Sequence, residues 1–321
     1  MTSVFGPTDT AVKIDRPGAG GRRMPGKGEI SRMWPQGVRC AVCLSFDFDA
    51  ESLYIGELER RRAAGDQRQY AVTLTPVSRG RYGAKAGLPR ILRRLEDWGI
   101  LATFFVPGLV AELHPELVRE IAARGHEVAN HGYYHENPTE FIGKPDGELA
   151  VLNRASDTLE KLTGHRPVGY RSPGWDLNPG TPELLLKAGM LYDSSLMDQE
   201  APYVLATSSG GSPLIELPVD WLLDDYVHFQ FSPPSVPGLS APSKVLEIWR
   251  GEFDGYYEDG GCLTLTMHPQ VMGRSHRLQM LATLVAHMRS KPGVWFATCG
   301  EIARYWVSAT ASLPLSNANL P

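Results

Sequence analysis

The sequence predicts an α/β fold in which parallel strands alternate with crossover helices, as a barrel or an open sheet. Three observations lead to this prediction. The chain has 321 residues and is 42% hydrophobic, which suits one large domain with a sizeable core. Roughly eight short apolar runs are separated, for the most part, by segments with helical spacing. Many polar residues that could do chemistry follow directly after those runs.

Residues 1–38 are rich in glycine, proline and arginine and show neither a strand nor a helix period. We interpret them as an irregular arm, which either packs on the body or a neighbouring subunit or is simply solvated. Residues 39–310 are expected to form the single domain, and residues 311–321 a C-terminal tail.

In the first half of the domain, apolar runs predict strands, and apolar residues three and four apart predict helices. Proline near the start of a helix, or glycine after its end, supports the helical segments. The expected order is strand 39–46, helix 89–98, strand 100–106, helix 115–124 and strand 127–130. Residues 52–86 break this rhythm, and the glycines of the stretch 78–83 and of the Y-G-x-x-x-G run at 82–87 lead us to expect a long loop there that acts as a lid or rim.

The same alternation continues to the end of the domain. Glycine after residue 163 marks one helix end, and the later strands are short apolar runs between helical segments. The expected order is helix 146–162, strand 168–171, helix 182–188, the short run 192–193, strand 215–219, helix 243–257, strand 262–267, helix 278–289 and strand 294–298.

The charge and the apolar runs exclude several classes of protein. A net charge of −4 and a pI near 6.2 offer no general attraction to nucleic acid or to an anionic membrane. No apolar run is long enough to cross a bilayer or to act as a secretion signal, so a cytoplasmic location is expected. The four cysteines are too few for a disulfide scaffold and are expected to be buried thiols.

One pair of histidines indicates a metal site. His131 and His135 lie four residues apart, so on a helical turn both rings would face one point and offer two nitrogen ligands. Two imidazoles and one carboxylate hold Zn²⁺, or in some proteins Fe²⁺, Co²⁺ or Ni²⁺, with positions left for water. No cysteine lies near these motifs to close the site, so we expect a catalytic metal.

The remaining polar residues supply the other parts of a hydrolytic site. Asp47 and Asp49 point to one side of a strand, so one can bind the metal while the other accepts a proton from water. Arg171 can hold a carboxylate, and His268 can protonate a departing nitrogen. All these candidates fall at the carboxyl ends of expected strands, the face where barrels build active sites; they are Asp47, Asp49, His131, His135, Arg171, Asp220 and His268.

Five motifs in this order carry a family resemblance. They are S-F-D-F-D at 45–49, H-G-Y-Y-H at 131–135, R-S-P-G-W at 171–175, P-V-D-W at 218–221 and T-M-H-P at 266–269. Together they resemble the polysaccharide deacetylase (NodB-homology, carbohydrate esterase 4) superfamily over roughly residues 40–300. The resemblance implies a distorted (β/α) barrel with about seven to eight parallel strands.

The resemblance also implies a role for each site residue. Asp49, His131 and His135 would bind the metal, and Asp47 would be the general base with Arg171 as its partner. His268 would be the general acid. An aspartate supports this acid in the family; Asp220 is our candidate for it, and Asp193 is also possible.

The chain departs from the family in one motif, because Phe48 separates the two aspartates that are usually adjacent. This version is similar to a cytosolic branch that includes allantoinase-like and cyclic imide hydrolases and peptidoglycan deacetylase-like proteins. The branch commonly forms homotetramers, which implies a homo-oligomer here.

The expected reaction is hydrolysis of a non-peptide carbon–nitrogen bond in a small amide, cyclic imide or ureide. Such a substrate requires an enclosed pocket, and aromatic side chains could line it. The candidate lining residues are Tyr82, Tyr134, Trp175 and Trp221. One alternative is an N-deacetylase of N-acetylglucosamine glycans such as peptidoglycan. A second is a non-catalytic carbohydrate-binding relative, which would be expected to have lost Asp47 or His268.

Overall fold

The computed structural model describes residues 33–63, 65, 74–205, 207, 213–230 and 239–311. The expected N-terminal arm therefore lies outside the described residues apart from its last six positions, 33–38. The expected C-terminal tail lies outside them apart from residue 311.

The described residues form a nine-stranded sheet in the order β6-β7-β5-β4-β3-β2-β1-β8, with β9 also paired to β1. Every pair is parallel except β6 with β7. The strands are β1 (Cys40–Asp47), β2 (Thr103–Val106), β3 (Glu127–Asn130), β4 (Gly169–Tyr170), β5 (Tyr192–Asp193), β6 (Tyr203–Leu205), β7 (Leu214–Glu216), β8 (Cys262–Met267) and β9 (Val294–Phe296). The predicted distorted barrel of about seven to eight parallel strands is confirmed, with β6 as an additional antiparallel strand.

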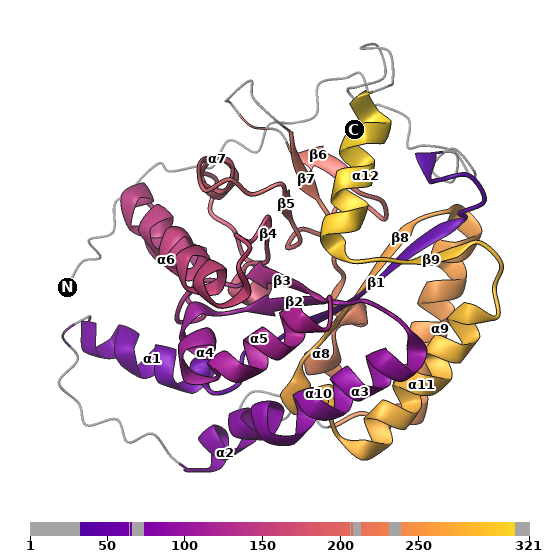
Figure 1. Cartoon of the computed structure of the whole chain (residues 1–321), viewed down its shortest axis with the longest axis horizontal. Coiled ribbons are helices and arrows are strands. Elements are labelled where there is room, and N and C mark those ends of the chain that lie inside the picture. The colour runs from indigo at the N-terminus through magenta and orange to yellow at the C-terminus, as the bar shows by residue number, and fades with distance from the viewer. Residues whose placement is uncertain are drawn as a thin grey trace, which may run out of the picture.

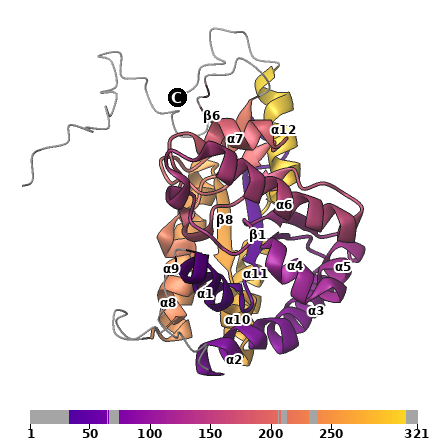
Figure 2. The same cartoon turned by 90° about the vertical axis from the view of Figure 1, so that its left-hand side faces the viewer.

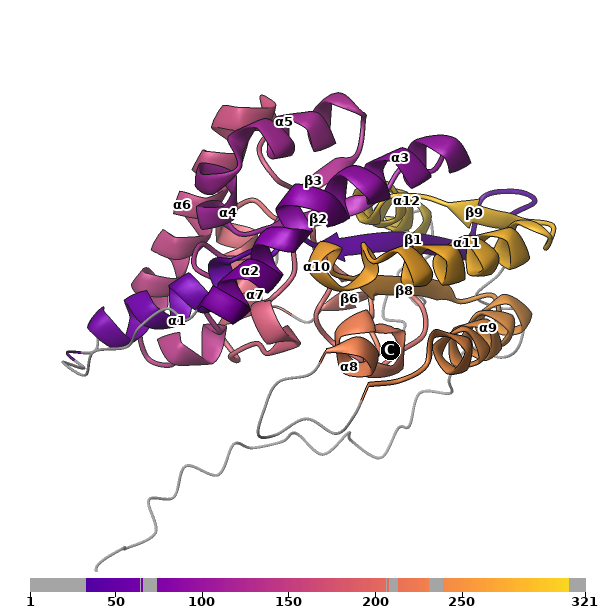
Figure 3. The same ribbon diagram turned by 90° about the horizontal axis from the view of Figure 1, so that it is seen from below.

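Helices lie around the outside of this sheet (Figures 1 and 3). They are α1 (Ser52–Ala63), α2 (Leu74–Tyr82), α3 (Leu88–Trp98), α4 (Gly108–Leu113), α5 (Pro115–Ala123), α6 (Pro145–Thr163), α7 (Thr181–Lys187), α8 (Asp225–Phe229), α9 (Pro242–Asp259), α10 (Pro269–Met272), α11 (Ser275–Arg289) and α12 (Cys299–Ala311). Short turns of π or 3₁₀ helix are η2 (Gly83–Gly87), η3 (Pro138–Phe141), η4 (Pro173–Trp175) and η5 (Trp221–Leu223). None of the described helices combines the length and the apolar character that a membrane span requires.

The expectation of a long loop over residues 52–86 is wrong. Residues 52–63 and 74–87 are helical, as α1, α2 and η2. The glycines that suggested a loop serve close packing instead: a Cβ on Gly80 would lie 2.4 Å from the Ala50 carbonyl oxygen, and one on Gly87 would lie 2.0 Å from that of Pro269. Glycine there lets the helices approach the segments that follow β1 and β8.

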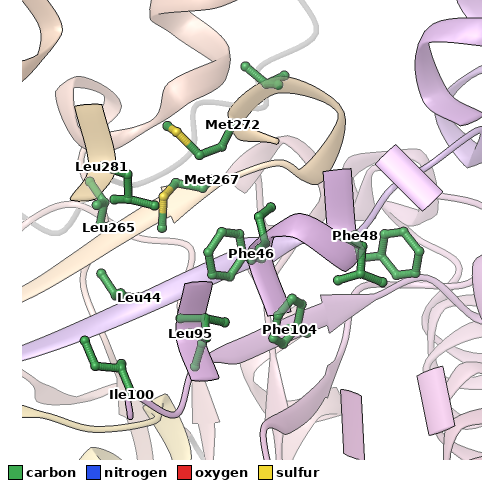
Figure 4. Close-up of a cluster of buried hydrophobic side chains, with 14 of the residues drawn as sticks. Leu44, Phe46, Phe48, Leu95, Ile100, Phe104, Leu265, Met267, Met272 and Leu281 are labelled. Carbon is green, nitrogen blue, oxygen red and sulfur yellow. The ribbon is translucent and has the colours of Figure 1, made fainter. Parts of the chain in front are cut away.

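The core is built around β1, which is buried along its whole length. Its side chains pack against β2, β8 and the helices α3 and α11, and Phe46 stacks on Phe104 with ring centroids 5.1 Å apart (Figure 4). All four cysteines are free and buried, as expected. Because the last residues of β1 pair with β2 on one side and β8 on the other, the carboxyl end of β1 is firmly fixed, and this is the end that carries Asp47.

Candidate active site

The predicted polar residues meet at the carboxyl ends of neighbouring strands. Asp47 ends β1, His131 follows β3, Arg171 follows β4 and His268 follows β8. Because β1 to β4 and β8 are parallel neighbours, these ends share one edge of the sheet. Figures 1 and 2 show α8 and α10 close to each other near the carboxyl end of β8.

Three side chains form a group with the donors of a metal site. The Nε2 atoms of His131 and His135 lie 3.5 Å and 3.8 Å from Oδ1 of Asp49. That oxygen is buried and accepts no hydrogen bond from the described residues. His131 Nδ1 lies 2.7 Å from the Arg171 carbonyl oxygen, so it is the protonated nitrogen and leaves the Nε2 lone pair facing Asp49.

The electrostatics of this group fit a divalent metal ion. Burial lowers the pKa of His131 to about 4 and that of His135 well below its usual value, so both rings are neutral and available as ligands at neutral pH. Burial and the charges of Asp47 and Asp224 raise the pKa of Asp49 to about 7. A cation between these donors would give the orphaned Asp49 oxygen a partner.

The two histidines do not share a helical turn, so that part of the prediction is wrong. The segment after β3 forms bends, and two of its residues have positive φ, Gly132 at 70° and His135 at 61°. The backbone N–H groups of Tyr133 and Tyr134 both donate to Glu136 Oε2, at 2.9 Å and 2.6 Å. This buried carboxylate folds the loop so that both rings face Asp49.

Asp47 is held by a buried arginine. Arg171 donates to Asp47 Oδ1 at 2.8 Å and also to Ser45 Oγ, to Ser194 Oγ and to the Ser194 carbonyl oxygen. Burial raises the pKa of Asp47, but the charge and hydrogen bond of Arg171 together with the charges of the nearby histidines outweigh it and hold that pKa below its usual value. Asp47 is therefore ionised at neutral pH, with Oδ2 4.0 Å from His268 Nε2.

His268 is held by two adjacent carboxylates. Asp225 Oδ1 lies 2.7 Å from His268 Nδ1, and Asp225 also accepts from the His268 backbone N–H. Asp224 Oδ1 lies 3.6 Å from the same Nδ1. Burial lowers the pKa of His268, but the Asp224 charge and the Asp225 hydrogen bond outweigh it and raise that pKa well above its usual value. His268 is therefore protonated, with Nε2 3.7 Å from Asp49 Oδ2.

Neither Asp220 nor Asp193, the carboxylates expected beside His268, occupies that position. Asp220 accepts from Leu222 N at 2.6 Å and caps η5, and Asp193 accepts from Ser195 Oγ at 2.9 Å. The physical reason is that η5 turns the chain after Asp220, so the next two carboxylates reach β8, where Asp224 pairs with Thr266. The adjacent carboxylates at 224–225 were the sequence signal that could have found them.

A cavity of about 270 Å³ opens above these groups. Its described lining consists of Asp47, Asp49, Leu53, His131, His135, Gly174, Trp175, Trp221, Asp224, Tyr226 and His268. Trp175 and Trp221 stack with ring centroids 4.5 Å apart, so two of the four expected aromatic walls lie in the cavity. Leu53 and Tyr226 were not anticipated.

The other two expected aromatic walls lie elsewhere. Tyr82 donates to the Gly273 carbonyl oxygen at 3.0 Å, and the Arg274 guanidinium covers its ring at 3.5 Å. The ring of Tyr134 packs edge-on against Tyr133, with centroids 4.7 Å apart. Both therefore have packing roles outside the described cavity lining.

Comparisons with known proteins find related sequences and related folds. The family model described as polysaccharide deacetylase matches residues 80–192. A peptidoglycan deacetylase of Helicobacter pylori is 32% identical over 288 residues, which cover 82% of this chain and 94% of that protein. The crystal structure of a Mycobacterium smegmatis protein assigned to the polysaccharide deacetylases is 39% identical, with a TM-score of 0.78 over 88% of this chain and 94% of that one. The structure of PuuE allantoinase is 25% identical, with a TM-score of 0.75 over 92% of this chain and 98% of that one.

Proposed function

Because the chain belongs to the polysaccharide deacetylase family, and is therefore a hydrolase of amide carbon–nitrogen bonds, we propose that it acts with a bound metal on a small cyclic imide, ureide or related amide. The observation that carries this proposal is the convergence of Asp49, His131 and His135 with Asp47 and His268 at the floor of one small cavity.

Asp49, His131 and His135 would hold the metal, and Zn²⁺ suits two imidazole nitrogens and one carboxylate with positions left open. A bound metal supplies Lewis acidity, which lowers the pKa of water and polarises a carbonyl. The neutral imidazoles and the unpartnered, buried Asp49 Oδ1 support this ligand set.

The chain's own residues would move the protons. Arg171 occupies Asp47 Oδ1, so Oδ2 remains to accept a proton from the attacking water. His268 Nε2 would donate a proton to the departing nitrogen, while Asp225 holds the other ring nitrogen. The pKa of Asp47 is lowered and that of His268 is raised, which sorts the pair into a base and an acid at neutral pH.

The dimensions of the cavity support a small substrate. Its volume of about 270 Å³ lies near the lower end of ligand pockets, which span roughly 300–1,000 Å³. The stacked pair Trp175 and Trp221 offers a flat apolar wall for a planar ring. The similarity to PuuE allantoinase, whose name describes action on a cyclic ureide, extends over nearly its whole length.

A second candidate substrate is an N-acetylated glycan. The name of the Helicobacter pylori relative favours it, and so does Trp221, which is 46% exposed at the cavity and could stack on a sugar ring. A non-catalytic carbohydrate-binding protein is the weaker alternative, because Asp47 and His268 are both present and paired. A cytoplasmic location and a homotetramer remain predictions from the sequence.

The test is hydrolysis by purified protein, stripped with EDTA and then reloaded with Zn²⁺. We expect the zinc form to open the ring of hydantoin or succinimide and the stripped form to be inactive. Acetate release from an N-acetylated chitooligosaccharide, without opening of the hydantoin or succinimide ring, would favour the N-acetylated glycan as substrate. Failure of the zinc form on both substrate classes would contradict the proposal.

A further inference from the structure

We propose that Asp224 binds the substrate: its second carboxylate oxygen accepts a hydrogen bond from an N–H at or beside the scissile amide, which makes the preferred substrate an uncharged amide with such a donor. The inference rests on the proposed function, because it takes the reaction and the cavity from it. It adds Asp224 to the substrate-binding residues and states which substrates the cavity should prefer.

Asp224 is placed where a bound molecule would meet it. It lies between η5 and α8 and lines the cavity beside Asp47, Asp49 and His268. The residue is only 5% exposed, and its pairing with Thr266 of β8 fixes its backbone. Asp224 is therefore both largely buried and part of the cavity wall.

The contacts of Asp224 use one of its two oxygens. Oδ1 accepts from Tyr226 N at 2.8 Å and so caps α8, and the same oxygen lies 3.6 Å from His268 Nδ1. No described residue donates a hydrogen bond to Oδ2. Asparagine or serine would cap the helix equally well, so capping does not explain a charged group at this position.

Support for His268 involves only Oδ1 of Asp224, which lies 3.6 Å from His268 Nδ1, and leaves Oδ2 without a role. Asp225 already accepts from both the Nδ1 and the backbone N–H of His268. A carboxylate oxygen in a largely buried residue costs free energy unless something donates to it. The structure therefore points to a partner that enters with the substrate.

The charge of the cavity defines what that partner is. Three carboxylates line it, those of Asp47, Asp49 and Asp224, and no lysine or arginine is among its described lining residues. The positive groups at the cavity are His268 and the proposed metal, and both already face these carboxylates, so an anionic substituent would meet repulsion. An uncharged imide or ureide carries an N–H that can donate a hydrogen bond to Asp224 Oδ2. A hydrogen bond to a charged acceptor is stronger than one to a neutral acceptor.

The experiment compares Asp224→Asn and Asp224→Ser with the control Asp220→Asn. Both Asp224 variants keep the cap of α8 and remove the charge, whereas the control removes a charge from the same segment outside the described cavity lining. The substrates are hydantoin, its N-methyl derivatives and hydantoin-5-acetate. Steady-state kinetics are measured on the zinc enzyme.

For the wild type we expect the loss of the relevant N–H, or the added carboxylate, to raise KM by about 10- to 100-fold, the range for a hydrogen bond to a charged group. In both Asp224 variants KM for hydantoin should rise by a similar factor, and the discrimination against the methylated ring should shrink. The control should discriminate like the wild type. Wild-type discrimination in both Asp224 variants would overturn the inference.

A binding assay separates this outcome from failure of the proposed reaction. Trp175 and Trp221 line the cavity, so tryptophan fluorescence reports binding without turnover. If the wild type hydrolyses none of these compounds, the proposed function fails, and the same ligands are titrated into the zinc-loaded proteins. Tighter binding of hydantoin than of its methyl derivatives, lost in Asp224→Asn, still supports the role of Asp224; equal binding by wild type and variant, or no binding by either, rejects it.

Discussion

At the scale of single residues, the site contains a base and an acid whose environments move their pKa values apart. Burial alone would favour the neutral form of each. Arg171 and the nearby histidines together reverse that effect at Asp47, and the carboxylates of Asp224, Asp225 and Asp49 together reverse it at His268. One fold thus keeps a carboxylate ionised and an imidazole protonated within 4.0 Å of each other.

Asp47→Asn should keep the metal and lose turnover. The amide oxygen can still accept from Arg171, but the side chain can no longer take a proton, and loss of a general base costs typically 10²- to 10⁴-fold in rate. Zinc content per chain and kcat measure the two effects. His131→Ala is the contrasting variant, because it should lose both zinc and activity. An Asp47→Asn protein with wild-type turnover would refute the role of Asp47 as base.

Asp225→Asn should move the alkaline limb of the pH–rate profile to lower pH. The raised pKa of His268 keeps it protonated, and an acid works below its pKa, so activity falls as pH rises through that value. Loss of the Asp225 charge lowers that pKa, and we expect a shift on the order of one pH unit. Asp220→Asn should leave the alkaline limb of the pH–rate profile unchanged. Equal shifts in the two variants would contradict the assignment of Asp225 as the partner of His268.

At the scale of elements, α1 holds the loop that carries both histidines. Gly56 in α1 packs against the backbone of Tyr134, where an added Cβ would lie only 2.0 Å from the carbonyl oxygen. Backbone atoms cannot move aside as a flexible side chain can, so the helix and the loop are positioned together. The glycine is needed for this close approach.

Gly56→Ala should therefore lower zinc affinity by displacing the loop. Ordinarily, changing a glycine inside a helix to alanine raises the free energy of unfolding by about 0.5–1 kcal/mol. Gly251→Ala in α9 is the matched control, because nothing lies within 4 Å of its added Cβ, and it should show this gain with unchanged zinc affinity. Zinc titration and urea unfolding measure both quantities. Unaltered zinc affinity in Gly56→Ala would show that the loop does not depend on α1.

The neighbouring strands β5 and β7 place two buried carboxyl groups, Asp193 and Glu216, opposite each other. Glu216 Oε1 accepts from the backbone N–H groups of Ser195 and Leu196. Burial raises the pKa of Asp193 to about 6, and burial with the Asp193 charge raises that of Glu216 well above its usual value. The folded protein therefore retains a proton that the unfolded chain releases.

This pair should make stability fall as pH rises. The loss begins above the unfolded pKa values, which are near 4, and continues through the raised pKa values of the folded state, at up to about 1.4 kcal/mol per pH unit for one proton. Glu216→Gln, which mimics the protonated group, should flatten this dependence in urea unfolding with EDTA present. Glu258→Gln changes an ion-paired surface glutamate whose side chain is 58% exposed and should not. If the dependence of stability on pH is the same in Glu216→Gln as in the wild type, the folded protein does not retain a proton at this pair.

At the scale of the whole molecule, the parallel sheet gathers residues that are far apart in the sequence, such as Asp49 and Gln270, which are 221 positions apart and whose side chains lie 3.4 Å from each other. The proposed metal ligands come from two segments, one after β1 and one after β3. A ligand that joins them binds the folded chain and not the unfolded one, so it should stabilise the entire domain.

Zinc should therefore raise the melting temperature. At a free concentration one hundred times the dissociation constant, one site adds about 2.7 kcal/mol, which corresponds to a rise of roughly 5–10 °C for a domain of this size. Differential scanning calorimetry with zinc or EDTA measures the shift. Asp47→Asn should show it and His131→Ala should not; a zinc-insensitive wild type would contradict the ligand set.

The sequence alone determined the strand and helix rhythm, the parallel sheet and the polar residues at its carboxyl edge. These features are local: an apolar run such as Cys262–Met267 predicts its own strand, and His268 follows it in the chain. Because parallel strands end on one side, residues placed after them must meet, whatever the helices between them do.

Only the tertiary structure decided which side chains pair and where the chain packs closely. Asp225 rather than Asp220 holds His268 because η5 redirects the chain, and His131 meets His135 through a bend fixed by Glu136. Gly80 and Gly87 suggested a loop in the sequence but permit helix packing in the fold. In each case the deciding contact joins separate elements or depends on a turn whose shape tertiary packing fixes, so no local pattern of residues records it.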